Sequence, residues 1–305
     1  MSRNQSRAWR ALALVISGLL IYACDRSPTG VETAGDFAAK VAQVAAAVTG
    51  QDAEIANEVE SGHFLGFDTF AYPGDEKMRA WKRAPNAPYD WVGYYLPNAP
   101  CHKGSTWSGK RQSLIDMGWG LAVVYVGQQT WNRKLRSLTP AQLDLQRRRG
   151  TTCNADFIGA ERGVEDARDA IQRARAEGFP KGTVIFLDIE RMEQVPSRMR
   201  DYYRSWTAAV LKDGTYRPGY YVHAHNARTV YGDVKGEFAT AGVKEEPRFW
   251  IASARDFSPD KSPEDVGHDF AGVWQGVIDV VRKVADVALP IDINVSNWAS
   301  PSDVD

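Results

Sequence analysis

From about residue 62 onward, short apolar runs alternate with amphipathic stretches. Short apolar runs bounded by turn residues are typical of buried strands, whereas apolar residues spaced by three and four predict helices. The predicted strands span residues 64–70, 90–96, 120–127, 183–189, 219–222, 248–253, 271–275 and 290–295. The predicted helices that we mark between them span residues 75–83, 108–117, 156–177 and 197–211.

Eight strands alternating with helices over about 244 residues match the arithmetic of a (β/α)8 barrel of the TIM type. We therefore predict an α/β fold in which this barrel occupies residues 62–305. A doubly wound open sheet is the alternative. No glycine-rich phosphate loop opens a helix after any predicted strand, which argues against the nucleotide-binding form of that alternative.

The N-terminal segment has the pattern of an export signal. Residues 1–23 carry three arginines and no acid, and the last arginine is followed by an uncharged run of 13 residues. A basic head, a short apolar stretch and a small residue before the cleavage point describe a secretory signal. The run is shorter than the roughly 20 residues that a membrane-spanning helix needs.

Residues 21–24 read Ile-Tyr-Ala-Cys and resemble a bacterial lipobox, which predicts Cys24 as a lipidation site. The protein is then expected to be exported and anchored in the cell envelope by its lipid. A plain signal peptide followed by an incidental cysteine is the alternative. Residues 24–61 are predicted to form a tether, with one helical pattern between Phe37 and Val48.

Composition and charge narrow the range of partners. The formal net charge of the 305 residues is −1, so a nucleic acid partner has little electrostatic support. The three cysteines cannot form a zinc site of four cysteines. Once Cys24 is set aside, an oxidising compartment favours a disulfide between Cys101 and Cys153. Two free buried thiols remain the alternative.

Acidic residues recur on the predicted strands, and functional groups of barrels gather at the C-terminal ends of strands. Asp68 ends the first strand, Asp188 and Glu190 lie on the fourth, and Asp292 lies on the last. Asp188 and Glu190 are two apart, so both side chains leave one face with Cα atoms about 6.5–7 Å apart. Close carboxylates raise each other's pKa, and acid-catalysed glycoside cleavage uses a protonated carboxyl beside an ionised one. A helix cap, or an ion pair with a loop arginine such as Arg191, is the alternative role for any single acid.

Aromatic and amide side chains accompany these acids on the later strands. The predicted substrate-binding residues are Tyr221, His223, Trp250, Trp274 and Gln275. Aromatic faces and amides beside carboxylates suit a sugar, which presents flat C–H faces and hydroxyl groups. Packing in the core is the alternative for each aromatic residue.

Other chemistries have weaker support in the sequence. His223 and His225 could bind a metal with neighbouring acids, but the chain has five histidines and no H-E-x-x-H motif. No G-x-S-x-G motif of a serine hydrolase occurs. We therefore expect no metal and no cofactor.

The motifs together resemble a bacterial family of secreted glycoside-hydrolase-like domains of unknown function. These domains are barrels related to the family 25 lysozymes of the Chalaropsis type. The resemblance covers about residues 62–298 and rests on GFD at 66–68, WVGYYL at 91–96, WGLAVVY at 119–125, GFP at 178–180, FLDIE at 186–190 and WQ at 274–275.

This resemblance implies a role for each of the four acids. Glu190 would be the general acid, and Asp188 would stabilise positive charge at the anomeric carbon or orient an N-acetyl group of the substrate. Asp68 and Asp292 would hold sugar hydroxyls and set the charge of the pair. The implied substrate is the glycan strand of peptidoglycan, cleaved after N-acetylmuramic acid.

Two further expectations remain open at this point. The stretch 128–156 is long and basic, so it is either a solvated loop or a positive lip that faces an anionic envelope polymer. The alternative to a hydrolase is a non-catalytic barrel that binds glycans, or acts as an envelope scaffold, and retains the carboxylates.

Overall fold

The structure is a computed structural model that describes residues 63–130, 139, 141 and 153–303. The predicted signal segment, the Cys24 lipidation site and the tether lie outside the described residues. Most of the basic stretch 128–156 lies outside them as well. No helix in the described part of the chain is both long enough and apolar enough to cross a membrane.

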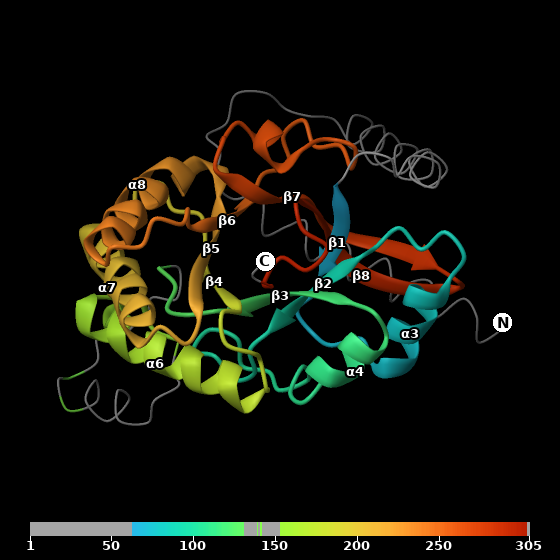
Figure 1. Cartoon of the computed structure of the whole chain (residues 1–305), viewed down its shortest axis with the longest axis horizontal. Helices are drawn as coiled ribbons and strands as arrows, with labels where there is room; N and C mark the ends of the chain where they lie inside the picture. Colours follow the sequence, from blue (N-terminus) through green and yellow to red (C-terminus); the bar gives the residue numbers. More distant parts are fainter. Residues whose placement is uncertain (1–62, 131–138, 140, 142–152, 304–305) are drawn as a thin grey trace, which may run out of the picture. The chain divides into compact units, whose positions relative to one another are not determined.

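Eight strands form a closed barrel in chain order, which confirms the predicted α/β barrel (Figure 1). The strands are β1 (Phe64–Asp68), β2 (Trp91–Tyr95), β3 (Gly120–Tyr125), β4 (Val184–Ile189), β5 (Arg217–His223), β6 (Arg248–Ala252), β7 (Ala271–Val284) and β8 (Val287–Ser296). The helices are α3 (Asp75–Arg83), α4 (Arg111–Asp116), α6 (Ala160–Ala176), α7 (Ser197–Asp213) and α8 (Ala224–Thr240), with short 3₁₀ turns at Ala155–Phe157 and Pro263–Val266.

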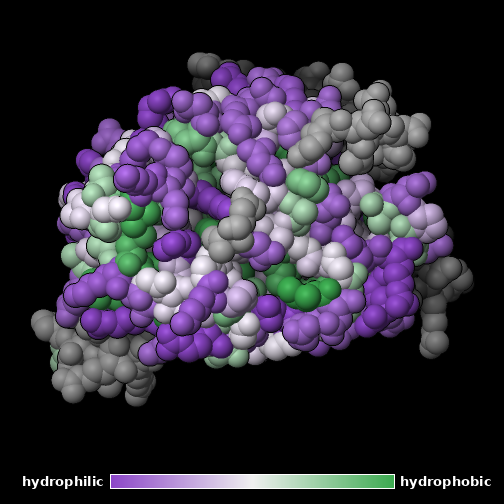
Figure 2. All heavy atoms as spheres, in the orientation of Figure 1, coloured by the Kyte–Doolittle hydropathy of each residue, from purple (hydrophilic) through white to green (hydrophobic). Residues whose placement is uncertain are grey.

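The core has two layers because side chains alternate across each strand. The layer inside the barrel contains Trp91, Val124, Phe186 and Trp250, together with smaller apolar residues. The opposite face of each strand packs beneath the helices and forms the larger cluster. Figure 1 shows α6, α7 and α8 side by side along one flank of the barrel. In the face drawn in Figure 2, hydrophilic residues cover most of the described surface and hydrophobic ones form separate patches.

The barrel departs from the predicted pattern at its last strand. β8 runs antiparallel to both β7 and β1, and no helix separates β7 from β8. The two strands form a hairpin whose turn contains Ala285 and Asp286, both with positive φ. Such a turn matches the twist of paired antiparallel strands. β7 therefore continues to Val284, well past the predicted end at residue 275.

Two local features hold the chain around the barrel ends. The structure joins Cys101 and Cys153 by a disulfide whose Cα atoms are 4.6 Å apart. At the opposite end, the side chain of Ser302 accepts the N–H of Val123, and its carbonyl accepts the N–H of Val184. The final described residues thereby cover the N-terminal ends of β3 and β4.

Candidate active site

The four predicted acids come together at the C-terminal end of the barrel. Asp68 is the last residue of β1, Asp188 lies in β4, and Glu190 directly follows that strand. Asp292 lies within β8, opposite Asp68 in the antiparallel register. All four line one pocket of about 100 Å³, whose other walls include Val124. β8 is antiparallel to its neighbours, so its C-terminus lies at the opposite end of the barrel. Asp292 therefore reaches the acid pocket from the middle of its strand.

Asp68 is the best hydrogen-bonded carboxylate of the four. Its Oδ1 accepts the hydroxyl of Tyr95 at 2.7 Å, and its Oδ2 accepts the amides of Gln275 at 2.8 Å and Asn294 at 3.0 Å. Burial raises the pKa of Asp68, while hydrogen bonds from Asn294, Tyr95 and Gln275 oppose the rise. Three donors make this carboxylate the favoured position for negative charge in the pocket.

Two glycines make room for the strand packing behind Asp68. A Cβ on Gly93 would lie 2.6 Å from the Cβ of Asp68 and 3.6 Å from the Trp250 ring. A Cβ on Gly66 would lie 2.1 Å from the indole of Trp91. Glycine at these two positions therefore allows the Asp68 side chain and the indole rings to pack inside the narrow barrel.

Asp188 and Glu190 occupy the opposite side of the pocket and differ in their partners. Burial raises the pKa of Asp188 well above its usual value, and the charges of Glu190 and Asp68 raise it further. The Oδ1 atom of Asp188 is buried without a hydrogen-bond partner among the described residues. Burial also raises the pKa of Glu190, opposed by a hydrogen bond from the Arg191 backbone. The pocket thus favours the protonated forms of both residues.

Gln129 holds the backbone of this acid pair in place. Its Nε2 donates to the carbonyl of Asp188 at 2.9 Å, and its Oε1 accepts the N–H of Glu190 at 3.3 Å. The Gln129 side chain is buried, so these contacts are shielded from water. Gln129 therefore fixes the point where the chain leaves β4.

The pKa of Asp292 is also strongly raised. Burial raises its pKa to about 8, and the negative charge of Asp68 adds to the rise. Its Oδ1 accepts the backbone N–H of Asp279 at 2.6 Å. Asp279 has positive φ at an irregularity in the register of β7, which turns this N–H toward the pocket. Asp279 adds a fifth carboxyl group near the site, and its charge also raises the pKa of Asp292.

Three of the predicted substrate-binding residues line the pocket. The Tyr221 hydroxyl donates to Oε1 of Gln275 at 2.7 Å. The indole N–H of Trp250 donates to Asn294 at 2.9 Å, and its ring packs against Tyr221. Gln275 also reaches Asp292, with its Nε2 3.3 Å from Oδ2. These side chains therefore connect Asp68 and Asp292 in one hydrogen-bonded network.

The other two predicted binding residues, Trp274 and His223, do not line this pocket. Trp274 neighbours Gln275 in β7, so its side chain leaves the opposite face of the strand. It is fully buried in the outer layer, where its indole N–H donates to the carbonyl of Ser253. His223 ends β5 and caps α8, its Nδ1 accepting the N–H of His225. His225 lies in the first turn of α8, so it does not share a strand face with His223.

Within the described ranges, no group of three or more His, Cys, Asp or Glu side chains is placed to hold a metal ion.

The family model of Rv2525c-like, glycoside hydrolase-like domains matches residues 79–296, which is more than half of the chain. The chain belongs to this family. The resemblance inferred from the sequence motifs is thereby confirmed. No curated protein matches the sequence of this Rv2525c-like chain.

Solved structures with the same fold include an uncharacterized protein of B. stearothermophilus. It is 18% identical, the match covers 76% of this chain and 95% of that one, and the TM-score is 0.52. A bacterial lysozyme from Streptomyces coelicolor is 15% identical over 79% of this chain and 94% of its own, with a TM-score of 0.48. The Tat-secreted protein Rv2525c of Mycobacterium tuberculosis, in complex with L-tartrate, is 18% identical over 76% and 94%, with a TM-score of 0.43. At these identities the likeness concerns the fold alone.

Sequence reasoning missed four residues that shape the site of this Rv2525c-like domain. They are Tyr95, Gln129, Asp279 and Asn294. Strand alternation places Tyr95 on the face of Gly93 and Asn294 on the face of Asp292, so that signal could have identified both. Nothing in the local pattern marks Gln129 or Asp279, because a loop contact and a strand irregularity position them.

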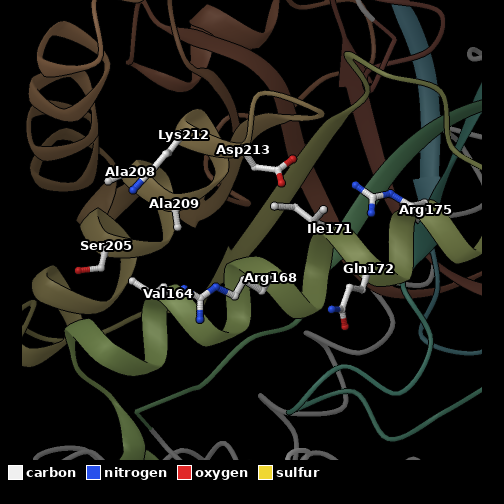
Figure 3. A pocket seen from close by; sticks show the side chains of 10 residues that line it. All are labelled: Val164, Arg168, Ile171, Gln172, Arg175, Ser205, Ala208, Ala209, Lys212 and Asp213. Atoms are coloured by element: carbon white, nitrogen blue, oxygen red, sulfur yellow. The ribbon is translucent and has the colours of Figure 1, made fainter.

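A larger groove lies outside the barrel, between α6 and α7 (Figure 3). Its volume is about 600 Å³, and it is lined by Arg168, Arg175 and Lys212 over an apolar floor that includes Ile171. Asp213 is the one acid among its lining residues. Size alone would favour this groove as the active site, yet none of the buried carboxyls with raised pKa lies in it. We therefore place the candidate site at the smaller pocket.

Proposed function

We propose that the protein is a muramidase-like glycoside hydrolase of the cell envelope that cleaves the glycan strands of peptidoglycan. The observation that carries this proposal is that four carboxyls line one pocket and differ in their hydrogen-bond partners. Burial raises the pKa of Asp68, Asp188 and Glu190 alike, but only at Asp68 do three side-chain hydrogen bonds oppose the rise. A protonated carboxyl beside an ionised one is the arrangement that glycoside hydrolysis uses.

In this proposal Glu190 donates its proton to the oxygen of the scissile glycosidic bond. The bond between that oxygen and the anomeric carbon then breaks, and positive charge develops on the sugar. Negative charge on Asp68 stabilises this charge across the small pocket. A water molecule then adds to the anomeric carbon and returns a proton to Glu190, which completes the cycle with atoms and charge balanced.

Asp188 is proposed to contact the substrate through the oxygen that lacks a partner. A buried carboxyl oxygen without a hydrogen bond gains stability when a ligand supplies one. The amide of an N-acetyl group on the sugar is a partner of suitable chemistry. The choice of peptidoglycan rests on the resemblance of the motifs to family 25 lysozymes. Export and a lipid anchor at Cys24 belong to the same proposal.

The test compares the full-length protein with a Glu190→Gln variant on purified, insoluble peptidoglycan. Soluble fragments are identified by mass spectrometry, and protein bound to the insoluble wall is measured in the same tubes. Glu193→Gln is the matched control, because Glu193 is highly exposed and only 3.9 Å from Arg191 in a weak surface pair. We expect fragments that end in reducing N-acetylmuramic acid from the wild type and the control, and at least a hundredfold less from Glu190→Gln.

Other outcomes would contradict the proposal in different ways. If both Glu190 forms bind the wall and neither releases fragments, the protein is a glycan-binding barrel rather than a hydrolase. If Glu190→Gln cleaves as fast as the wild type, Glu190 is not the general acid. If no form binds or cuts, peptidoglycan is the wrong polymer.

A further inference from the structure

The acid pocket is too small to hold a glycan chain by itself. Its volume of about 100 Å³ corresponds to a few water molecules, each of which occupies about 30 Å³ in the liquid. A polymer that places one bond in this pocket must therefore rest its neighbouring sugars on the rim. The rim next to β1 carries an unusual side chain.

Phe70 lies two residues beyond Asp68, so the two Cα atoms are at most about 7 Å apart. Its side chain is 63% exposed. Among the residues that the structure describes, every other Phe, Tyr and Trp is buried or half-buried. A single exposed apolar residue is common on protein surfaces, so exposure alone assigns no role. The rings beneath Phe70 supply the second observation.

Three rings form a continuous wall from the surface to the acids. The Phe70 ring centroid lies 4.2 Å from that of His102, and His102 stacks on Tyr95 at 4.9 Å with an interplanar angle of 18°. Tyr95 donates its hydroxyl to Asp68. Burial lowers the pKa of His102 to about 4, so the ring is neutral and the wall carries no positive charge at neutral pH. The exposed part of Phe70 is the outer end of this wall.

The backbone around Phe70 is held in place before any ligand binds. The indole N–H of Trp107 donates to the Phe70 carbonyl at 3.2 Å, and the Tyr72 N–H donates to the hydroxyl of Thr106 at 3.0 Å. The Cys101–Cys153 disulfide lies next to His102 in the chain. A surface fixed in this way loses little conformational entropy on binding, which favours a role in recognition.

We propose that Phe70 is a stacking platform for a sugar of the bound glycan next to the one at the acid pocket. The flat ring would cover the C–H face of that sugar, while the hydroxyls remain in water. This inference rests on the proposed function for its ligand, a peptidoglycan glycan strand. It adds a binding residue that acts through contact with the substrate rather than through the chemistry.

The test measures binding of full-length protein to insoluble peptidoglycan by co-sedimentation, with Glu190→Gln as the background so that the ligand stays intact. Phe70→Ala and Phe70→Leu remove the flat ring, and Phe70→Trp retains it. Ile115→Ala is the matched control, because Ile115 is 42% exposed on α4 and does not line the pocket. We expect the first two variants to bind about tenfold more weakly, and Phe70→Trp and the control to bind like the background protein.

A second readout separates this inference from the proposed function. In the cleaving form, Phe70→Ala should raise KM about tenfold and change kcat much less, because the lost contact is remote from the scissile bond. The melting temperature of Phe70→Leu shows whether this variant keeps the fold around the three rings. Leucine is chosen because it keeps apolar contact with His102. The proposed role of Phe70 would be wrong if Phe70→Leu bound peptidoglycan as well as the background protein does. It would also be wrong if the background protein did not bind peptidoglycan at all. If the wild type binds peptidoglycan but does not cleave it, the proposed hydrolase activity is wrong. The binding of the Phe70 variants can still be compared in that case.

Discussion

Replacing Asp292 by asparagine removes a titrating group and keeps an oxygen that can accept the N–H of Asp279. The ordinary pKa of this carboxyl is 3.8, and burial in the fold raises it to about 8. Between these values the folded protein holds a proton that the unfolded chain has released. By linkage, the free energy of unfolding falls as pH rises. The contribution is complete below about pH 4 and is lost as pH passes about 8.

The size of the effect follows from the same two values. At about 1.36 kcal/mol per pKa unit, a rise from 3.8 to about 8 corresponds to about 5 to 6 kcal/mol of unfolding free energy. This is an upper limit, because water entering the pocket would stabilise the ionised carboxylate. We expect the wild type to lose several kcal/mol between about pH 5 and about pH 8.5, and Asp292→Asn to lose much less.

Urea denaturation at the two pH values measures both free energies of unfolding. Asp260→Asn is the matched control, because it makes the same change on an exposed loop after β6. The pH dependence that remains in Asp292→Asn belongs to the other buried acids with raised pKa values, which include Asp68, Asp166, Asp188 and Glu190. If wild type and Asp292→Asn give parallel dependences on pH, the proton is not on Asp292 and the electrostatic argument for the pocket is refuted.

Two further predictions concern the support of the carboxylates. Gly93→Ala should lower the free energy of unfolding by about 1–3 kcal/mol, because its methyl group would lie 2.6 Å from the Cβ of Asp68. Gly232→Ala in α8 should raise this free energy by about 0.5–1 kcal/mol, because a Cβ there meets no neighbouring atom within 4 Å. Thermal melts with shifts of the same sign would contradict this. Gln129→Met keeps the volume but loses both hydrogen bonds to the backbone of the acid pair, so kcat should fall about tenfold or more with little change in wall binding. An unchanged kcat would remove Gln129 from the site.

The elements with clear periodicity could be predicted closely from the sequence. The helix predicted at 75–83 is α3, whose first turn carries two acids, whose last turn carries two basic residues, and whose buried face is Met78 and Trp81. The fourth strand was predicted at 183–189 and spans Val184–Ile189. In both cases local pattern and burial agree, so tertiary packing had no reason to override the pattern.

The predictions failed where position depends on distant contacts or on weak local signals. The sequence does not predict the helix α8, because Gly232 and Gly236 interrupt its pattern and both disfavour helix. The direction of β8 could not be read from its residues, since its turn is Ala285–Asp286 rather than the usual Asn-Gly. Asp292 was nevertheless assigned to the site, because alternation along a strand is the same in both directions.

The inner face of the barrel changes character toward its C-terminal end. The lower positions hold Trp91, Phe186 and other apolar side chains, whereas the upper ones hold the carboxyls and their amide and hydroxyl partners. A barrel that needed only to fold would gain stability from apolar side chains at these upper positions as well, because buried carboxyls with raised pKa destabilise it at neutral and alkaline pH. Burial in the pocket also raises the pKa of Glu190, the proposed general acid. The loss of stability and the proposed acid catalysis therefore have one physical cause.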